Sequence, residues 1–368
     1  MIRKIKSAFT VIPVILFFVS GCSVTETART DIKKPAVRNI ILFIGDGMGA
    51  AHVYAAMTAS KNPLVIESFP YTGFSKTWSA NNYITDSGAG ATAIACGVKT
   101  RNGMIGTGPD STRLVSITEI LHDHGLSNGV ISTCQITHAT PAAFVAHNVK
   151  RANFEEIALD FLKGNADVFI GGGEDYFRNR KDGKDLAVNL KELGYDVVYN
   201  IDDLKNSGAP KIAGLLAKKD MPKASDGRQG MLAEMTRKAI ETLSRDNDGF
   251  FLMVEGSMID WAASEKDLNY TISEVLDLDS AVGVAKDFAV KNGETLVVVT
   301  ADHETGGMYL SGGNIEQKKV TAGFNEKGGH SGIMVPIFSF GPGAEKFSGI
   351  HDNTFFMNQF LELLEIQK

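Results

Sequence analysis

The sequence predicts an α/β fold, a three-layer α/β/α sandwich around a large, mostly parallel β-sheet. Short runs of β-branched and aromatic residues, typical of buried strands, alternate along the chain with longer segments expected to form helices. The chain has 368 residues, of which 43% are hydrophobic, so it can bury a large core. We expect residues 38–368 to form a single domain with a small cap.

The expected strands and helices alternate along the chain. Strands are expected at residues 39–44, 129–133, 167–170, 196–199, 250–254, 295–300 and 336–340. Helices are expected at residues 112–124, 154–163, 229–245 and 279–290, each before one of these strands. This alternation favours parallel strands with helices on both faces, and in such sheets ligands bind beyond the carboxyl ends of the strands.

The N-terminal residues are typical of an export signal. Basic residues precede an apolar run over residues 8–19, which is short for a membrane span but suits a signal peptide. The run ends in Val-Ser-Gly-Cys, which resembles a bacterial lipobox, so residues 1–21 would be removed and Cys22 lipidated. A plain secretory signal is the alternative. We expect an exported protein of the periplasm or outer membrane, anchored through Cys22 and a flexible tether over residues 22–37.

Charge and cysteine content narrow the possible partners and cross-links. The formal net charge of −6 does not favour binding to a polyanion, so no nucleic-acid partner is expected. Cys96 and Cys134 lie among small and apolar residues, where a free cysteine is often a buried hydrophobic side chain. Export permits a disulfide, but two lone cysteines form no framework, so no bridge between them is expected.

Polar side chains follow four of the expected strands. They are Asp46 after residues 39–44, His138 and Thr140 after 129–133, Glu255 after 250–254, and Asp302 and His303 after 295–300. Because the carboxyl ends of parallel strands meet at one edge of the sheet, we expect these side chains to converge. Oxygen and imidazole ligands without a nearby cysteine ligand indicate a metal cluster of the zinc or magnesium type.

Residues 85–93 form a segment of small side chains around Ser87. A helix of such residues can approach another backbone or a ligand closely. We expect Ser87 at the start of this helix, where free N–H groups and the helix dipole favour an anion. The alternative is that Ser87 only caps the helix, a common use of serine. The metal-type ligands elsewhere in the chain favour a catalytic serine.

Eight short motifs occur along the chain in a fixed order. They are IGDGMG (44–49), DSGAGATA (86–93), GVKT (97–100), HATPA (138–142), VEGS (254–257), ID (259–260), TADHETGG (300–307) and GHS (329–331). In order and spacing this set resembles the alkaline phosphatase family along nearly all of the mature chain. The resemblance implies a three-layer α/β sandwich, in agreement with the strand pattern, and a site that holds two zinc ions and one magnesium ion.

The resemblance also assigns metal ligands residue by residue. It implies Asp302, His303 and Ser87 at the second zinc, Asp46 between that zinc and magnesium, His138, Thr140 and Glu255 at magnesium, and Asp260 and His330 at the first zinc. It makes Ser87 the nucleophile, which forms a phosphoserine that water then hydrolyses. Arg151, thirteen residues after His138, corresponds to the arginine that clamps the phosphate. A guanidinium fork suits two phosphate oxygens.

The first zinc site departs from the family pattern. The family places a histidine four residues after Asp260, where this chain has Ser264. Glu265 could replace that ligand, water could fill the position, or the site could hold a weaker or different metal. His138 and Trp261 also differ from the residues at these positions in some bacterial relatives. A neutral imidazole is a softer ligand than a carboxylate, so His138 suits zinc at the third site better than it suits magnesium. Trp261 is expected to pack at the rim of the site.

Three functions compete on the sequence alone. The first is hydrolysis of small phosphate monoesters, which fits the short segment between Gly307 and His330 and the open site it predicts. The second is a phosphodiesterase of the same superfamily, which would usually lack the arginine clamp. The third is a lipoprotein that binds phosphate or metal with weak or no turnover, an alternative that Ser264 keeps open. The family resemblance also implies a possible homodimer.

Overall fold

The structure is a computed structural model that describes residues 36–367. The expected signal peptide, Cys22 and the expected tether up to residue 35 lie outside the described residues. Within residues 36–367, none of the helices has the length and apolar character that a membrane crossing requires.

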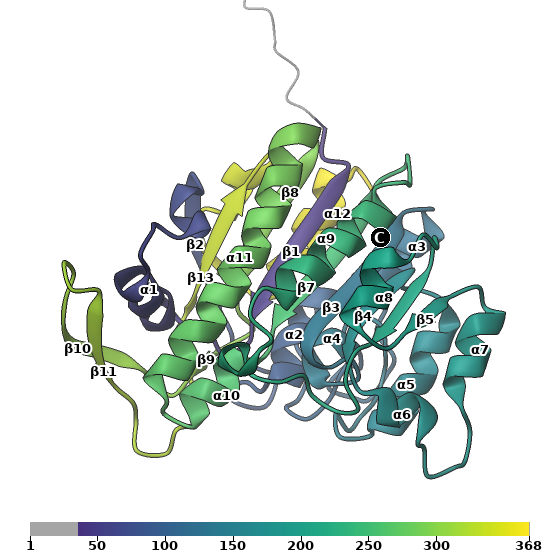
Figure 1. The fold of residues 1–368 in the computed structure, drawn as a ribbon, viewed down its shortest axis with the longest axis horizontal. Helices are drawn as coiled ribbons and strands as arrows, with labels where there is room; N and C mark the ends of the chain where they lie inside the picture. The colour runs from purple at the N-terminus through teal and green to yellow at the C-terminus, as the bar shows by residue number, and fades with distance from the viewer. Residues whose placement is uncertain (1–35, 368) are drawn as a thin grey trace, which may run out of the picture. The chain divides into compact units, whose positions relative to one another are not determined.

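A ten-stranded sheet forms the middle layer of the domain (Figure 1), with the strand order β14-β2-β13-β8-β1-β7-β3-β4-β6-β5. β13 runs antiparallel to both neighbours, and all other neighbouring pairs are parallel. The strands are β1 (Asn39–Gly45), β2 (Tyr71–Lys76), β3 (Ser127–Gln135), β4 (Val168–Gly172), β5 (Asp196–Val198), β6 (Ile212–Leu215), β7 (Phe250–Gly256), β8 (Thr295–Thr300), β13 (Val335–Phe340) and β14 (Gly349–Asp352). The predicted mostly parallel sheet is therefore confirmed.

The seven expected strands are present, whereas β2, β6 and β14 were not expected from the sequence. β2 and β14 pair at one edge of the sheet, where exposed side chains interrupt the apolar pattern that marks a buried strand. β6 is buried but has only four residues, Ile-Ala-Gly-Leu, and it is held between β4 and β5. The formation of each of these three strands therefore depends more on pairing with neighbouring strands than on the β-propensity of its own residues.

Side chains of the central strands alternate between two hydrophobic layers, one on each face of the sheet. In β1, Ile40 and Leu42 belong to one layer, and Ile41 and Phe43 to the other. The first layer is covered by α2 (Ser87–Cys96), α3 (Ile117–Asp123), α4 (Ala139–Ala142), α5 (Phe154–Asp160), α6 (Glu174–Arg178), α7 (Leu186–Glu192) and α12 (Phe355–Leu363). The second is covered by α1 (Ala50–Ala59), α8 (Ile201–Asn206), α9 (Met231–Leu243), α10 (Met258–Ser264) and α11 (Leu268–Asn292).

Two helices differ from the expected bounds for local reasons. α3 begins at Ile117 rather than at residue 112, because Ser116 and Glu119 form a capping box that fixes the helix start. α11 begins eleven residues before the expected residue 279, where the Asp267 side chain accepts a hydrogen bond from the N–H of Tyr270. The additional N-terminal turns of α11 bury Tyr270, Val275 and Leu278 in the second hydrophobic layer, and this burial stabilises the longer helix.

The segment after Gly307 folds as a two-stranded hairpin, β10 (Tyr309–Asn314) and β11 (Lys319–Gly323), which contacts α1. The chain then returns toward the sheet edge through a second, two-residue ladder between β9 (Glu304–Thr305) and β12 (His330–Ser331). The sequence pattern predicts neither pairing, and the second pairing brings a candidate ligand to the site.

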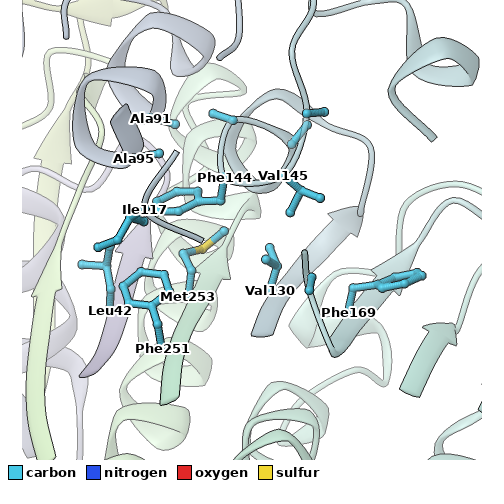
Figure 2. Packing of buried hydrophobic residues seen from close by; sticks show 14 of the residues in the cluster. Leu42, Ala91, Ala95, Ile117, Val130, Phe144, Val145, Phe169, Phe251 and Met253 are labelled. Carbon is cyan, nitrogen blue, oxygen red and sulfur yellow. The ribbon is translucent and has the colours of Figure 1, made fainter. Parts of the chain in front are cut away.

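Substitution of Phe144 tests the packing of the hydrophobic layer between the sheet and helices α2 and α4. It is fully buried in the turn after α4, and its ring lies 6.1 Å from that of Phe251 in β7 (Figure 2). We expect Phe144→Ala to lower the free energy of unfolding by about 3–5 kcal/mol, because it leaves a cavity against the sheet. Denaturant unfolding measures the change.

The exposed Tyr309→Ala is the control and should change the free energy of unfolding by less than about 0.5 kcal/mol. Phe144→Leu, which fills more of the space, should cost less than Phe144→Ala. Equal effects of Phe144→Ala and Tyr309→Ala would contradict the packing described here.

Candidate metal centre and active site

The carboxyl ends of three adjacent strands place acidic side chains at one level of the sheet. β1 lies between β7 and β8, and its Ile44 is in register with Glu255 of β7 and with Thr300 of β8. Asp46 and Asp302 follow two residues after these register positions, and each of the three carboxylates is at most 1% exposed. The sequence placed Glu255 after its strand, whereas β7 continues through it to Gly256.

The predicted ligands come together in three groups whose nitrogen, oxygen or sulfur atoms lie within 4.8 Å of one another. The groups are Asp46, Asp302 and His303; Asp260, His303 and His330; and Cys134, His138 and Glu255. Thr140, in α4, lies beside the first group, where its hydroxyl donates a hydrogen bond to Asp46 Oδ2 at 3.3 Å. The eight Asp, Glu, His and Thr side chains expected as metal ligands therefore lie in one region, and the third group also contains Cys134, which corrects the expectation that no cysteine lies nearby.

The ladder between β9 and β12 brings His330 to the site from a distant part of the sequence. His330 pairs with Thr305, and its Nδ1 donates to the carbonyl oxygen of Thr85 at 2.8 Å. Its ring stacks on that of His303 with a centroid separation of 3.6 Å, and its Nε2 lies 3.4 Å from Asp260 Oδ1. The Thr305 hydroxyl donates to the same carboxylate oxygen of Asp260.

Ser87 is the first residue of α2, and Asp86 caps that helix. The Asp86 side chain accepts a hydrogen bond from the N–H of Ala89 at 2.9 Å, so the alternative in which Ser87 is the cap is wrong. Ser87 Oγ lies 3.2 Å from His303 Nε2. A Cβ at Gly90 would lie 2.8 Å from the carbonyl oxygen of Asp302, so only glycine lets α2 approach this closely.

Arg151 is held beside the start of α2 by the same capping residue. Its Nη1 donates to Asp86 Oδ2 at 3.0 Å, and that oxygen also accepts from the N–H of Gly103 at 2.8 Å. Its Nη2 lies 3.4 Å from His138 Nε2. The guanidinium therefore lies near both Ser87 and the third ligand group, as expected for a group that binds an anion there. Sequence reasoning gave Asp86 no role, although its position three residues before Ala89 is typical of a helix cap.

The buried carboxylates have the electrostatic character of a cation site. Asp46 Oδ1, Asp302 Oδ2 and Glu255 Oε1 are buried and have no hydrogen-bond partner within residues 36–367. Burial, with the neighbouring carboxylates, raises the pKa of Asp46, that of Asp302 to about 6 and that of Glu255 to about 8. Divalent cations would compensate this concentration of negative charge, so the residues fit bound metal ions.

Two of the site histidines, His303 and His138, are held in the neutral form that binds metals, whereas Asp260 raises the pKa of His330. Burial, aided by the neighbouring His330, lowers the pKa of His303 to about 3. Burial and the positive charge of Arg151 lower the pKa of His138 to about 4. At Asp260, burial acts in the opposite direction, but the hydrogen bond from His330 and the nearby imidazoles hold its pKa below the usual range. Neutral imidazole and ionised carboxylate are the ligand forms that zinc binds.

Both residues considered for the altered first site, Ser264 and Glu265, are exposed. Ser264 ends α10 with an exposed side chain. Glu265 is exposed as well, and its Oε2 accepts a hydrogen bond from Lys223 Nζ at 3.0 Å. Trp261 lies edge-on to the ring of His138, with centroids 6.2 Å apart, and is partly buried at this position. Among the Asp, Glu, His and Cys side chains of the described residues, the second group therefore holds Asp260, His303 and His330 without Glu265.

The geometry identifies the class of protein. A serine hydroxyl at a helix N-terminus, an adjacent arginine and groups of oxygen and nitrogen ligands are the arrangement that a metal-dependent phosphohydrolase uses. A family model described as alkaline phosphatase matches residues 37–328. The chain therefore belongs to the alkaline phosphatase family and is a phosphoric monoester hydrolase.

Similar proteins include enzymes and solved structures of this family. Alkaline phosphatase 4 of Bacillus subtilis is 32% identical, and the match covers 95% of this chain and 94% of the relative. Alkaline phosphatase of Escherichia coli is 31% identical over 90% of this chain and 86% of its own length. The structure of alkaline phosphatase from the Antarctic bacterium TAB5 is 38% identical, covers 91% of this chain and 100% of its own, and has a TM-score of 0.86.

Glu255 gives the metal-free protein a characteristic dependence on pH. Its folded pKa of about 8 lies above the ordinary value of 4.5, so folding takes up a proton and this stabilisation is lost as pH rises toward 8. We expect the metal-free protein to lose about 2 kcal/mol more stability than its Glu255→Gln variant between about pH 6.5 and about pH 8.5. Denaturant unfolding in the presence of a chelator measures this difference.

The chosen pH range separates the contribution of Glu255 to the pH dependence of stability from that of the histidines whose pKa is lowered. His138 and His303 are neutral in both the folded and unfolded states above their ordinary pKa of 6.5, so they add little slope there. Protein loaded with metal is the control and should show a smaller difference between the two chains. Parallel pH profiles for the metal-free wild type and Glu255→Gln would contradict this assignment.

Proposed function

We propose that the chain hydrolyses phosphate monoesters through a phosphoserine on Ser87 and releases inorganic phosphate. The observation that carries the proposal is the position of Ser87 Oγ, 3.2 Å from His303 Nε2 at the N-terminus of a ten-residue helix. Membership of the alkaline phosphatase family supports the monoester reaction itself. The serine intermediate and the individual metal sites are our extension of it.

The ligand groups suit three divalent cations. One zinc ion would be held by Asp46, Asp302 and His303, and another by Asp260 and His330. A third cation would be held around Glu255, His138 and Thr140, and a solved variant of the TAB5 enzyme with Mg bound in its M3 site supports a third position. When bound, such metals make a serine hydroxyl more acidic and stabilise charge on attacking and leaving oxygens.

The chain's own residues position the substrate and carry the phosphoryl group. Arg151 would bind two phosphate oxygens through its planar fork, while Asp86 holds it in place. The N-terminus of α2 favours the phosphate anion beside Ser87. Ser87 Oγ forms the new bond to phosphorus as the ester oxygen leaves with the alcohol. Water then breaks the Ser87–phosphorus bond and phosphate is released.

We expect Ser87→Ala to lower phosphatase activity by several orders of magnitude and to abolish labelling by a radioactive phosphate ester. Labelling in acid-quenched wild-type protein, mapped to the peptide that contains Ser87, measures the intermediate. Ser68→Ala, at an exposed serine of the turn Val65–Ser68 outside the ligand groups, should retain both activity and labelling. Persistent labelling in Ser87→Ala would refute the proposed nucleophile.

Ser264 favours a second candidate function, a protein that binds phosphate or metal but turns over slowly. The exposed serine leaves Asp260 and His330 with fewer ligands than a closed zinc site uses. A phosphodiesterase is the less favoured alternative, because the clamp role that we propose for Arg151, held by Asp86, suits the free oxygens of a monoester. Relative rates on a monoester and a diester distinguish the two reactions.

We expect Ser264→His to bind zinc more tightly in the group of Asp260 and His330 and to raise the monoester rate. Zinc content after dialysis and the steady-state rate are the measurements. Ser264→Ala is the matched control and should resemble the wild type, because the serine side chain is exposed. No gain in zinc or rate for Ser264→His would show that the serine does not limit this site.

We also propose where and with what the protein acts. The lipobox-like motif at Cys22 supports export and lipid anchoring in the periplasm or outer membrane. The short hairpin segment after Gly307 supports an open site for small phosphate monoesters. Homodimer formation, which the family resemblance implies, stays a proposal as well.

A further inference from the structure

Cys134 lies in the third ligand group, beside His138 and Glu255. We propose that the Cys134 thiolate is a ligand of the third cation and that this site therefore prefers zinc to magnesium. The inference rests on the metal centre proposed above, but it concerns a residue to which the family resemblance assigns no role. The magnesium expected there from that resemblance stays a prediction, and the ligand chemistry argues against it.

The backbone of β3 directs Cys134 toward the end of β7. β3 pairs with β7 in parallel register up to Ser132 and Glu255, and its pairing with β4 is irregular just beyond that point. Ser257 fixes the irregular segment, because its hydroxyl accepts from the N–H of Cys134 at 3.2 Å and its own N–H donates to the Thr133 hydroxyl. The Cys134 side chain is fully buried, and its Sγ lies 3.7 Å from Glu255 Oε2.

Glu255 gives an independent indication that a cation belongs beside this thiol. Its carboxylate is 0% exposed, and its Oε1 has no hydrogen-bond partner within the described chain. No Lys or Arg of residues 36–367 forms an ion pair with Glu255. The nearby Arg151 pairs with Asp86 instead. The imidazole Nδ1 of His138 is likewise buried without a partner in that range. A buried carboxylate oxygen without a donor, next to a thiol and an imidazole, is the arrangement expected of a cation site.

The composition of the group decides which cation it favours. Thiolate, imidazole and carboxylate together are ligands of zinc-type ions, and thiolates strongly disfavour magnesium, which takes oxygen ligands in octahedral geometry. Binding would replace the S–H bond of Cys134 by a metal–sulfur bond, and the proton would leave to solvent. Residues Cys134 and His138 are four positions apart, so β3 and the start of α4 supply both soft ligands.

The chain offers a matched test because it has three cysteines. In full-length protein with Cys22→Ser and Cys96→Ser, Cys134 is the one cysteine left. The comparison protein carries Cys22→Ser and Cys134→Ser and keeps Cys96, a buried cysteine of α2. Both are depleted of metal and titrated with Cd²⁺, whose thiolate complexes absorb in the ultraviolet by charge transfer from sulfur.

We expect the ultraviolet band in the protein that keeps Cys134, with one thiolate per chain, and its absence in the protein that keeps Cys96. Excess Mg²⁺ should leave the band in place. No band in the Cys134 protein at saturating Cd²⁺, an equal band in both proteins, or displacement by Mg²⁺ would overturn the proposal.

A second measurement needs no change at Cys134. X-ray absorption by zinc in the protein that keeps Cys134 should show a sulfur neighbour at about 2.3 Å, and its absence would overturn the proposal even if the Cys134→Ser chain fails to fold. Radioactive labelling of Ser87 is read separately. If the wild-type protein is labelled on Ser87 but shows no zinc–sulfur contact, this inference alone is refuted. If the wild-type protein is not labelled on Ser87, the proposed function is refuted.

Discussion

Burial of three carboxylates at the ends of adjacent parallel strands is the constraint on which the site depends. Asp46, Glu255 and Asp302 lie there because β1 holds β7 and β8 in register. Without a compensating charge, burial and mutual repulsion raise their pKa values. Divalent cations would reverse this effect, so the same arrangement that destabilises the metal-free centre favours tight binding.

The nucleophile segment is built around this centre by close backbone approach. Gly90 lets α2 lie against the backbone of Asp302, so Ser87 is presented to His303 from the helix start. Asp86 caps the same helix and also holds Arg151, which couples the position of the phosphate-binding group to that of the nucleophile. A substitution of Asp86 or Arg151 would therefore disturb the orientation of the phosphate-binding guanidinium and of the helix that carries Ser87, as well as the local charge.

Much of the fold followed from local sequence, because buried strands such as β1 and β8 are continuous apolar runs. Edge strands such as β2 were not predictable in this way, since their side chains are partly exposed and their pairing depends on neighbours. The ligand residues were predicted from strand ends and from family motifs. Cys134 was not, because its partner Glu255 lies 121 residues away and only the parallel pairing of β3 with β7 brings them together.

The central claim is that these buried groups hold metal ions beside Ser87. Anomalous diffraction at the zinc absorption edge, from crystals of the purified wild-type protein supplied with zinc, tests it most directly. The account predicts anomalous peaks within coordination distance of Asp46, Asp302 and His303, and of Asp260 and His330. Catalytically active crystals with no peak at the group of Asp46, Asp302 and His303 would contradict it.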